Sequence, residues 1–254
     1  MARETRDVSV SARFRTVGVL GGMGPDATVD FLSKVLRASG AQTDQDHLRV
    51  IADINPQIPD RNRAIAEGSR APGEVLAEMA RGLERAGADF LVMPCNTAHA
   101  FQSEIERATR LPFISIIHET VAAVRRTGPD TGPHIGRIGL LATTGCLAAR
   151  LYDRAFSSAG IRTLVLDSGE LERFMALVYR IKAADLGEDV RSQMRQLALT
   201  LHDRGAQIIV SGCTEVPLAL DLTGSLPSVV DSTAVLAERT VAYARGEAEF
   251  PRSL

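Results

Sequence analysis

Two cysteines occupy matching short segments, and a pair of thiols can carry out acid–base, nucleophilic or redox chemistry. Cys95 follows a predicted strand at 89–93, and Cys213 follows one at 206–210. A Gly-Ala pair opens each segment, and a threonine comes shortly after each cysteine. Each segment is therefore predicted to contain a helix end, a buried strand and then a cysteine where the strand ends.

The spacing of these segments indicates an internal duplication. The cysteines are 118 residues apart (213 − 95), the apolar segment 16–21 resembles 137–142, and a Leu-Pro pair before an apolar run occurs at 111 and again at 226. Three ordered matches at nearly one offset are typical of a repeated unit. The two halves are then expected to place their cysteines at equivalent strand ends, facing each other across a cleft.

The position of each thiol favours a chemical role over simple packing. A lone buried cysteine usually acts as a small hydrophobic residue, and Cys146 is interpreted in that way. Cys95 and Cys213 lie where a strand ends and a helix begins, and helix N-termini lower the pKa of a thiol. His99 and Glu215 follow shortly after and are candidate partners for the thiols, although helix capping or a surface position explains such residues equally well.

Two facing thiols leave three chemistries open: a redox pair, a nucleophile with a spare, or two acid–base groups on opposite sides of a substrate. Only the third needs near-symmetry, because inverting a stereocentre removes a proton from one face and returns one to the other. The products are mirror images of equal energy, so the reverse reaction must use the same two groups with exchanged roles. A duplicated fold supplies such a pair.

Alternating strand and helix patterns must position these residues. The apolar periodicity predicts strands at 17–20, 48–54, 89–93, 112–117, 137–142, 161–166, 206–210 and 229–231, and helices after the glycine loop 21–25 and at 72–85, 97–109, 171–181, 186–204 and 233–245. Two prolines make 55–61 a stiff loop, and 128–136 is predicted to be a surface linker. The alternation predicts parallel sheets with right-handed crossovers.

Three features outside the cysteine segments could hold a substrate. The glycine loop 21–25 loosely fits a dinucleotide-binding fingerprint, but the acidic candidate Asp53 lies 29 residues past Gly24 (53 − 24), farther than that motif requires. Arg61 ends a loop of the kind where open α/β sheets bind ligands, and its fork could clamp a carboxylate; a surface charge is the alternative. Lys182 is one of two lysines among 29 basic residues, and a solvated lysine at a helix end is the alternative.

The composition argues against several partner classes. The chain has 254 residues, 45% of them hydrophobic, and a net charge of −2, so it can bury full cores and has no basic excess for a nucleic acid or an anionic membrane. No apolar run approaches the roughly 18 residues of a membrane span, and 1–15 lacks the apolar segment of a signal peptide. Three cysteines without a Cys-x-x-Cys motif fit free thiols in a reducing cytoplasm. The five histidines show no ligand-type spacing, so no metal site is expected.

Five motifs together resemble the cofactor-independent aspartate/glutamate racemase superfamily, and its aspartate branch above all. In family order they are Gly21–Pro25, Pro56–Arg61, Met93–His99, Leu141–Gly145 and Gly212–Glu215, within a resemblance that covers about residues 16–245. The resemblance implies two pseudo-symmetric Rossmann-like domains, doubly wound around parallel sheets, with the active site in the cleft between them. We expect the first domain at 16–113 plus 228–246, the second at 114–227, and tails at 1–15 and 247–254.

The resemblance also implies the residues of the site. Cys95 and Cys213 are expected to be catalytic, with His99 and Glu215 in support. Substrate binding is implied for Arg61, Lys182, Met23, Gly24, Asn96, Thr97, Thr143, Thr144 and Thr214. The family's glutamate racemases commonly carry histidine at the place of Glu215, which favours aspartate here. Many members of the aspartate branch carry threonine at the place of Cys146, a departure that affects no essential group.

The function implied is that of a pyridoxal-phosphate-independent amino-acid racemase, an isomerase that inverts Cα of aspartate with two cysteines. No cofactor, a small dicarboxylic amino-acid substrate, a cytoplasmic location and a homodimer belong to the same expectation. Glutamate or broad-specificity racemisation and maleate isomerisation on the same scaffold are the nearest alternatives, and two retained cysteines argue against arylmalonate decarboxylation. An NAD-binding oxidoreductase and a non-catalytic amino-acid binding protein are alternatives of other classes.

Overall fold

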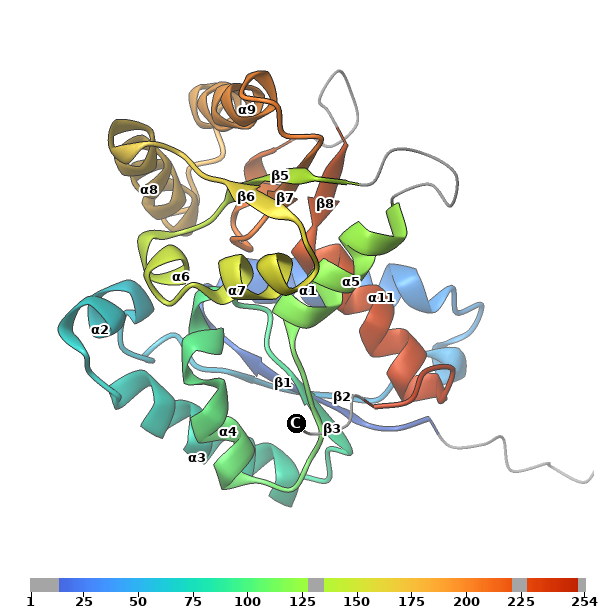
Figure 1. Ribbon diagram of the computed structural model, residues 1–254. Coiled ribbons are helices and arrows are strands. Elements are labelled where there is room, and N and C mark those ends of the chain that lie inside the picture. The colour runs from blue at the N-terminus through green and yellow to red at the C-terminus, as the bar shows by residue number, and fades with distance from the viewer. Residues whose placement is uncertain (1–13, 128–134, 221–227, 251–254) are drawn as a thin grey trace, which may run out of the picture.

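Two four-stranded parallel sheets form the framework of the protein (Figure 1). The computed structural model describes residues 14–127, 135–220 and 228–250. The first sheet has the order β2-β1-β3-β4, from strands β1 (Val17–Gly21), β2 (Val50–Ile54), β3 (Phe90–Val92) and β4 (Phe113–Ile114). The second has the order β6-β5-β7-β8, from β5 (Arg137–Leu141), β6 (Arg162–Leu164), β7 (Ile208–Ser211) and β8 (Val229–Asp231). The identical order in both halves confirms the predicted pseudo-symmetric α/β fold.

The strands that lead to the cysteines hold equivalent places in the two sheets. In the first sheet β1 pairs with both β2 and β3, and in the second β5 pairs with both β6 and β7. Cys95 lies three residues past the end of β3, and Cys213 lies two residues past the end of β7. Because all these pairings are parallel, both cysteines lie at the carboxyl ends of their sheets, where α/β folds bind ligands.

A layer of four helices lies between the two sheets (Figure 1): α1 (Pro25–Ser39), α5 (Ile116–Thr127), α7 (Leu151–Ser158) and α11 (Ser232–Arg245). Side chains of both sheets meet these helices in one hydrophobic core, among them Val19 and Val92 from the first sheet and Leu140 and Val210 from the second. The two halves therefore share this central core.

Outer helices cover the other face of each sheet (Figure 1). Helices α3 (Ala71–Arg85) and α4 (Gln102–Ala108) cover the first sheet, where Leu76 packs with Leu20 and Leu91. Helices α8 (Ser168–Lys182) and α9 (Glu188–Asp203) cover the second, where Phe174 packs with Ile209. Strands buried on both faces are expected to be continuous apolar runs, which is why the sequence made them easy to find.

Short helices lie close to the site: α2 (Arg61–Glu67), the 3-10 helix η2 (Thr97–Phe101), α6 (Thr144–Ala148) and α10 (Val216–Ala219), with a further 3-10 helix η1 (Asp44–Asp46) at the surface. The single helix predicted at 97–109 is thus two elements, η2 and α4. Helix α2 begins at Arg61, where the stiff loop predicted at 55–61 ends, because the Asp60 side chain caps it by accepting the Arg63 amide at 2.8 Å.

The predicted strand 112–117 is only β4 with two residues, and helix α5 starts at Ile116. Its apolar residues continue without a break from strand into helix, so periodicity did not separate them. Strand β8 pairs with β7 in the second sheet, whereas α11 after it packs against α1, so the domain division at 228 stays a prediction. Residues 128–134 of the predicted linker, and 1–13 and 251–254 of the predicted tails, lie outside the described residues.

One of the two lysines joins the halves. The Lys34 ammonium on α1 lies 2.5 Å from Asp30 and 2.7 Å from Asp231 at the end of β8. The Asp231 side chain is 5% exposed and also caps α11 by accepting the amides of Thr233 and Ala234. Of the helices that the structure describes, none is both long and apolar enough to cross a lipid bilayer.

Candidate active site

Both cysteines open into one small cavity at the carboxyl ends of the two sheets. Its volume is about 20 Å³. The walls come from both halves of the chain: Met23, Arg61, Asn62, Cys95, Asn96, Thr97, Thr143, Lys182, Cys213, Thr214 and Glu215. The structure thus brings together the two cysteines and most of the residues that the sequence placed at the site.

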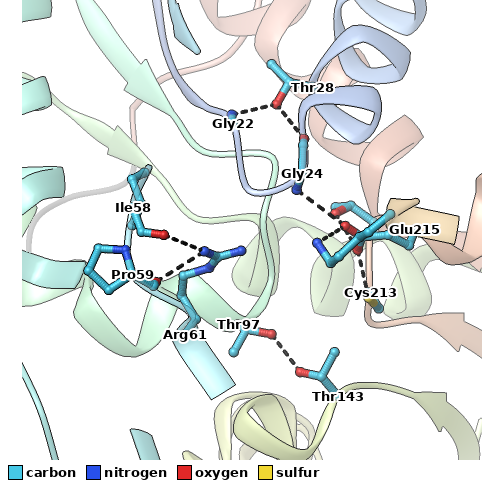
Figure 2. Close-up of polar contacts among 12 residues, drawn as sticks. Gly22, Gly24, Thr28, Ile58, Pro59, Arg61, Thr97, Thr143, Cys213 and Glu215 are labelled. Atoms are coloured by element: carbon cyan, nitrogen blue, oxygen red, sulfur yellow. Dashed lines mark hydrogen bonds and ion pairs between the residues drawn. The ribbon is translucent and has the colours of Figure 1, made fainter. Parts of the chain in front are cut away.

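A glycine turn shapes one wall of this cavity (Figure 2). Gly22 has a φ of +95°, and an added Cβ would lie 2.4 Å from the Asn55 carbonyl carbon, so only glycine fits there. The Thr28 hydroxyl closes the turn, since it accepts the Gly22 amide at 3.0 Å and donates to the Gly24 carbonyl at 3.1 Å. The turn directs the Gly24 amide towards Glu215, to which it donates at 3.3 Å.

The Glu215 carboxylate is the centre of a buried polar cluster (Figure 2). One of its oxygens accepts the Gly24 amide and pairs with the Lys182 ammonium at hydrogen-bond distance. The other accepts a hydrogen bond from the Cys213 thiol, with 2.9 Å between Sγ and Oε2. The Thr214 hydroxyl also donates to Oε2 at 3.4 Å. Glu215 is 3% exposed, so the carboxylate exchanges its contacts with water for these four donors.

These contacts set the protonation of the cluster. Burial raises the pKa of Cys213 well above its usual range, and the neighbouring Glu215 charge raises it further, while Lys182 acts in the opposite direction. Burial alone would lower the pKa of Lys182, but Glu215 and the nearby thiols outweigh it, so that pKa is raised and the ammonium stays charged. The sequence-based prediction that a helix N-terminus lowers the pKa of this thiol is wrong for Cys213, because α10 is only four residues long and the thiol is buried beside a carboxylate.

Arg61 supplies the second cation of the cavity. Its Nη1 donates to the carbonyls of Ile58 and Pro59 at 3.1 and 3.2 Å, which holds the side chain against the stiff loop (Figure 2). Neither bond uses Nε or Nη2, so those donors of the fork are left for a ligand. Arg61 and Glu215 both line the same cavity.

Hydrogen bonds across the cavity hold the two halves together. The hydroxyls of Thr97 and Thr143 share one of 2.7 Å, and the Gly145 amide donates to Asn62 Oδ1 at 3.0 Å. Asn62 was not identified from the sequence, although it follows Arg61 directly. A Cβ on Gly145 would lie 2.8 Å from Asn62 Oδ1, so the close approach of α2 and α6 depends on that glycine.

Two residues predicted for the site lie away from the thiols. His99 is buried, with Nδ1 2.8 Å from the Cys95 carbonyl, and its Nε2 accepts the Ile116 amide at 3.1 Å. Nδ1 therefore carries the proton, and burial lowers the pKa of His99 to about 4, so the ring is a neutral brace for the cysteine loop and not a partner of the thiol. The Thr144 side chain is exposed and contacts Met175, which places it outside the cavity wall.

The third cysteine lies in the shared core, as its interpretation as a packing residue predicted. Burial raises the pKa of Cys146 to about 12, and the charge of nearby Cys95 adds to the effect. All three cysteines are free thiols. Within the part of the chain that the structure describes, no group of three or more His, Cys, Asp and Glu side chains could hold a metal ion.

Comparisons with known proteins agree with this architecture. The family model described as Asp/Glu/Hydantoin racemase matches residues 20–240. The broad specificity amino-acid racemase RacX of Bacillus subtilis is 29% identical over 235 residues, which are 89% of this chain and 96% of RacX. A glutamate racemase of Pseudomonas aeruginosa is 31% identical over 236 residues, 81% of this chain and 83% of that protein.

Among solved structures, the Picrophilus torridus aspartate racemase superposes with a TM-score of 0.80 at 28% identity, covering 91% of this chain and 94% of that one. The relatives thus include racemases named for aspartate, for glutamate and for a broad range of amino acids. With a family model that spans most of its length and two thiols in one cavity between pseudo-symmetric halves, the chain belongs to the Asp/Glu/hydantoin racemase family.

Proposed function

We propose that this protein is a racemase of acidic amino acids, aspartate first, that inverts Cα with Cys95 and Cys213 and without pyridoxal phosphate. The observation that carries the proposal is that two thiols from equivalent strand ends line one cavity together with two cations and a carboxylate. Such a cavity can act on both faces of one carbon atom. A thiol pair for redox chemistry or a single nucleophile would not need the second half to repeat the first.

The charges in the cavity match a dicarboxylic amino acid. Arg61 and Lys182 can each receive a carboxylate, and Glu215 can receive the ammonium group of the substrate. Lys182 pairs with Glu215, so the substrate ammonium would replace Lys182 there and release it for a carboxylate. A neutral amino acid would leave one of the two cations without a partner in a buried site, which is costly.

The chemistry we propose needs one thiolate and one thiol. The thiolate removes the Cα proton, and the opposite thiol donates its own proton to the other face. The product is the mirror-image amino acid, with the two sulfurs exchanged in protonation. The carbanion between these steps places more negative charge on the α-carboxylate, so the cation already fixed there stabilises the transition state more than the ground state.

Glu215 would assign the resting roles of the two thiols. A thiol 2.9 Å from a buried carboxylate keeps its proton, so we propose that Cys213 rests as the thiol and Cys95 begins as the base. The substrate ammonium that replaces Lys182 would keep one cation on Glu215, so Cys213 would remain the proton donor when the reaction starts.

The substrate must open the site to enter. A cavity of about 20 Å³ holds about one water molecule, and an amino acid is several times larger. The contacts that would part are those across the cavity, Thr97 with Thr143, Asn62 with Gly145 and Gly24 with Glu215. We propose that closure over the substrate excludes water from the carbanion.

Racemisation of a wider range of amino acids is the second candidate, because RacX matches over nearly its whole length. The homodimer and the cytoplasmic setting predicted above belong to the proposal as well, and sedimentation tests the dimer. The decisive experiment offers the purified enzyme L-aspartate, L-glutamate, L-alanine and maleate separately and follows the product by chiral chromatography. Preference for the two acidic amino acids supports the proposal, and preference for alanine supports the second candidate.

The thiol assignment is tested by three matched variants. Cys95→Ser and Cys213→Ser should each lose racemisation by several orders of magnitude, because a serine hydroxyl is far too weakly acidic to act as the missing base. Cys146→Ser removes a buried thiol outside the cavity wall and should stay active within a few-fold. Near wild-type racemisation by either of the first two variants would contradict the two-thiol mechanism.

A further inference from the structure

A buried chain of hydrogen bonds connects the loops that carry the two thiols. The Tyr152 hydroxyl on α7 donates to Asn96 Oδ1 at 2.6 Å, and Asn96 Nδ2 donates to the Ser232 hydroxyl at 3.2 Å. The Ser232 hydroxyl in turn donates to the Ser211 carbonyl at 2.6 Å. All four residues are at most 1% exposed. Each group therefore has a fixed partner in a place that water does not reach.

The chain has a single consistent direction. Ser232 has one hydroxyl proton, which goes to Ser211, so it can only accept from Asn96. The Asn96 carboxamide must then turn its NH₂ group to Ser232 and its oxygen to Tyr152. A flipped carboxamide would set an acceptor against Ser232, which has no proton left to donate, and would break that bond. Ser232 thereby sets the orientation of the Asn96 carboxamide, and the Tyr152 hydroxyl holds its oxygen in place.

The part of the chain from Asn96 through Ser232 to Ser211 joins the two catalytic loops, and Tyr152 holds Asn96 from the other side. Asn96 follows Cys95 directly, and Ser211 lies two residues before Cys213. We infer that Tyr152 is a positioning residue that acts through Asn96 and Ser232 to hold the Cys95 and Cys213 loops at a fixed separation. The repeat alone does not explain this link, because Tyr152 and Ser232 lie on helices of the central layer and not on either cysteine loop.

This inference rests on the proposed two-thiol racemisation and adds a requirement to it. Removing a proton needs only one thiol in place, whereas inversion needs both thiols aligned on opposite faces of Cα during one visit of the substrate. Looser coupling between the loops should therefore harm inversion more than exchange of the Cα proton. A residue needed only for folding would lower both rates together.

The position of Tyr152 lets it affect the geometry of the catalytic loops without contacting the substrate. Among the residues that the structure describes, Asn96 lines the cavity and Tyr152 does not. The tyrosine ring lies in the shared core and stacks on Phe156 with 5.8 Å between centroids. Burial raises the pKa of the hydroxyl, so it remains a donor throughout the working pH range. Its loss should change kcat more than KM.

The test compares Tyr152→Phe with Tyr243→Phe. Both tyrosines are buried and both hydroxyls donate at 2.6 Å, but Tyr243 bonds to Glu119, away from the cavity. In deuterated water we expect Tyr152→Phe to lower the kcat of racemisation about 10- to 100-fold, as for a misplaced catalytic group. The ratio of Cα exchange to inversion should rise several-fold while KM stays within a factor of about two. Tyr243→Phe should keep the wild-type ratio.

A second measurement does not depend on activity. Hydrogen exchange read by mass spectrometry should speed up in the segments 90–97 and 208–215 together in Tyr152→Phe, and in neither segment in Tyr243→Phe. Ser232→Ala interrupts the chain one step later and should reproduce the result if Tyr152→Phe folds poorly. A wild-type exchange-to-inversion ratio in Tyr152→Phe, or faster exchange in only one segment, would overturn the inference. If the wild-type enzyme racemises none of the amino acids, the proposed function fails. The hydrogen-exchange rates of the two segments then still show whether the loops are linked.

Discussion

The hydrogen bond between Glu215 and Cys213 predicts that Glu215→Gln makes the thiol more acidic. The carboxylate lies 2.9 Å from Sγ with both residues buried. At an effective dielectric constant of about 20, two unit charges 4 Å apart interact by about 4 kcal/mol. Lys182 and residual solvent offset part of this repulsion, and even about 1.4 kcal/mol would raise the thiolate fraction at a given pH about tenfold. Glutamine keeps the shape and a neutral acceptor, so the charge is the main change.

The assay uses a background in which Cys213 is the only thiol. The protein has three cysteines, so Cys95→Ser with Cys146→Ser leaves that thiol alone. Ultraviolet absorbance of the thiolate is then followed against pH with Glu215 present and with Glu215→Gln. We expect the transition to move to lower pH in the variant, because burial remains and the repelling charge is gone.

The matched control is Glu119→Gln, which neutralises another buried carboxylate, one that bonds to Arg239 and Tyr243 and not to a thiol. Its titration should coincide with that of the background protein. An unchanged or higher transition in Glu215→Gln would refute the claim that Glu215 holds the proton on Cys213. The resting roles proposed for the two thiols would then have to be exchanged or abandoned.

Three further predictions concern single residues. Arg61→Ala should raise KM for the acidic substrate about tenfold or more, and Arg61→Lys clearly less, because the lysine keeps the charge without the fork; equal effects would make Arg61 a general charge. Lys34→Met should lower the free energy of unfolding by about 3 kcal/mol, because Asp231 then stays buried without its cation. Lys34→Arg should keep most of the wild-type stability. Chemical denaturation measures both variants. His99 has a pKa of about 4 when folded and 6.5 otherwise, so the unfolded chain binds its proton more readily. The free energy of unfolding should therefore fall by about 3 kcal/mol from pH 6.5 to pH 4, and His99→Gln should remove that part of the fall.

The strands and most of the long helices could be predicted from the sequence because they depend on local residue patterns. Strands such as β1, β3, β5 and β7 are buried on both faces, so each is an apolar run that needs no partner to be recognised. The repeat at 118 residues then placed the two cysteines at equivalent strand ends. Helix α5 was missed for the same kind of reason, since its apolar residues follow β4 without a turn.

The polar part of the site depends on contacts between residues far apart in the chain. Lys182 meets Glu215 across 33 residues, and Gly24 meets it across 191. No local pattern indicates that Glu215 would raise the pKa of Cys213 or that His99 would turn to a carbonyl. Asn62 escaped notice because its partner, the Gly145 amide, belongs to the other half.

The central claim is that inversion uses two thiols on opposite faces of Cα. The most direct measurement follows racemisation of each aspartate enantiomer separately in deuterated water and determines deuterium at Cα in the substrate and in the product at early times. The two-thiol account predicts deuterium in the product enantiomer with little in the recovered substrate, from either direction, because the returning proton comes from the opposite sulfur. Equal labelling of substrate and product from the first turnovers would mean that one group serves both faces, and that result would contradict the account.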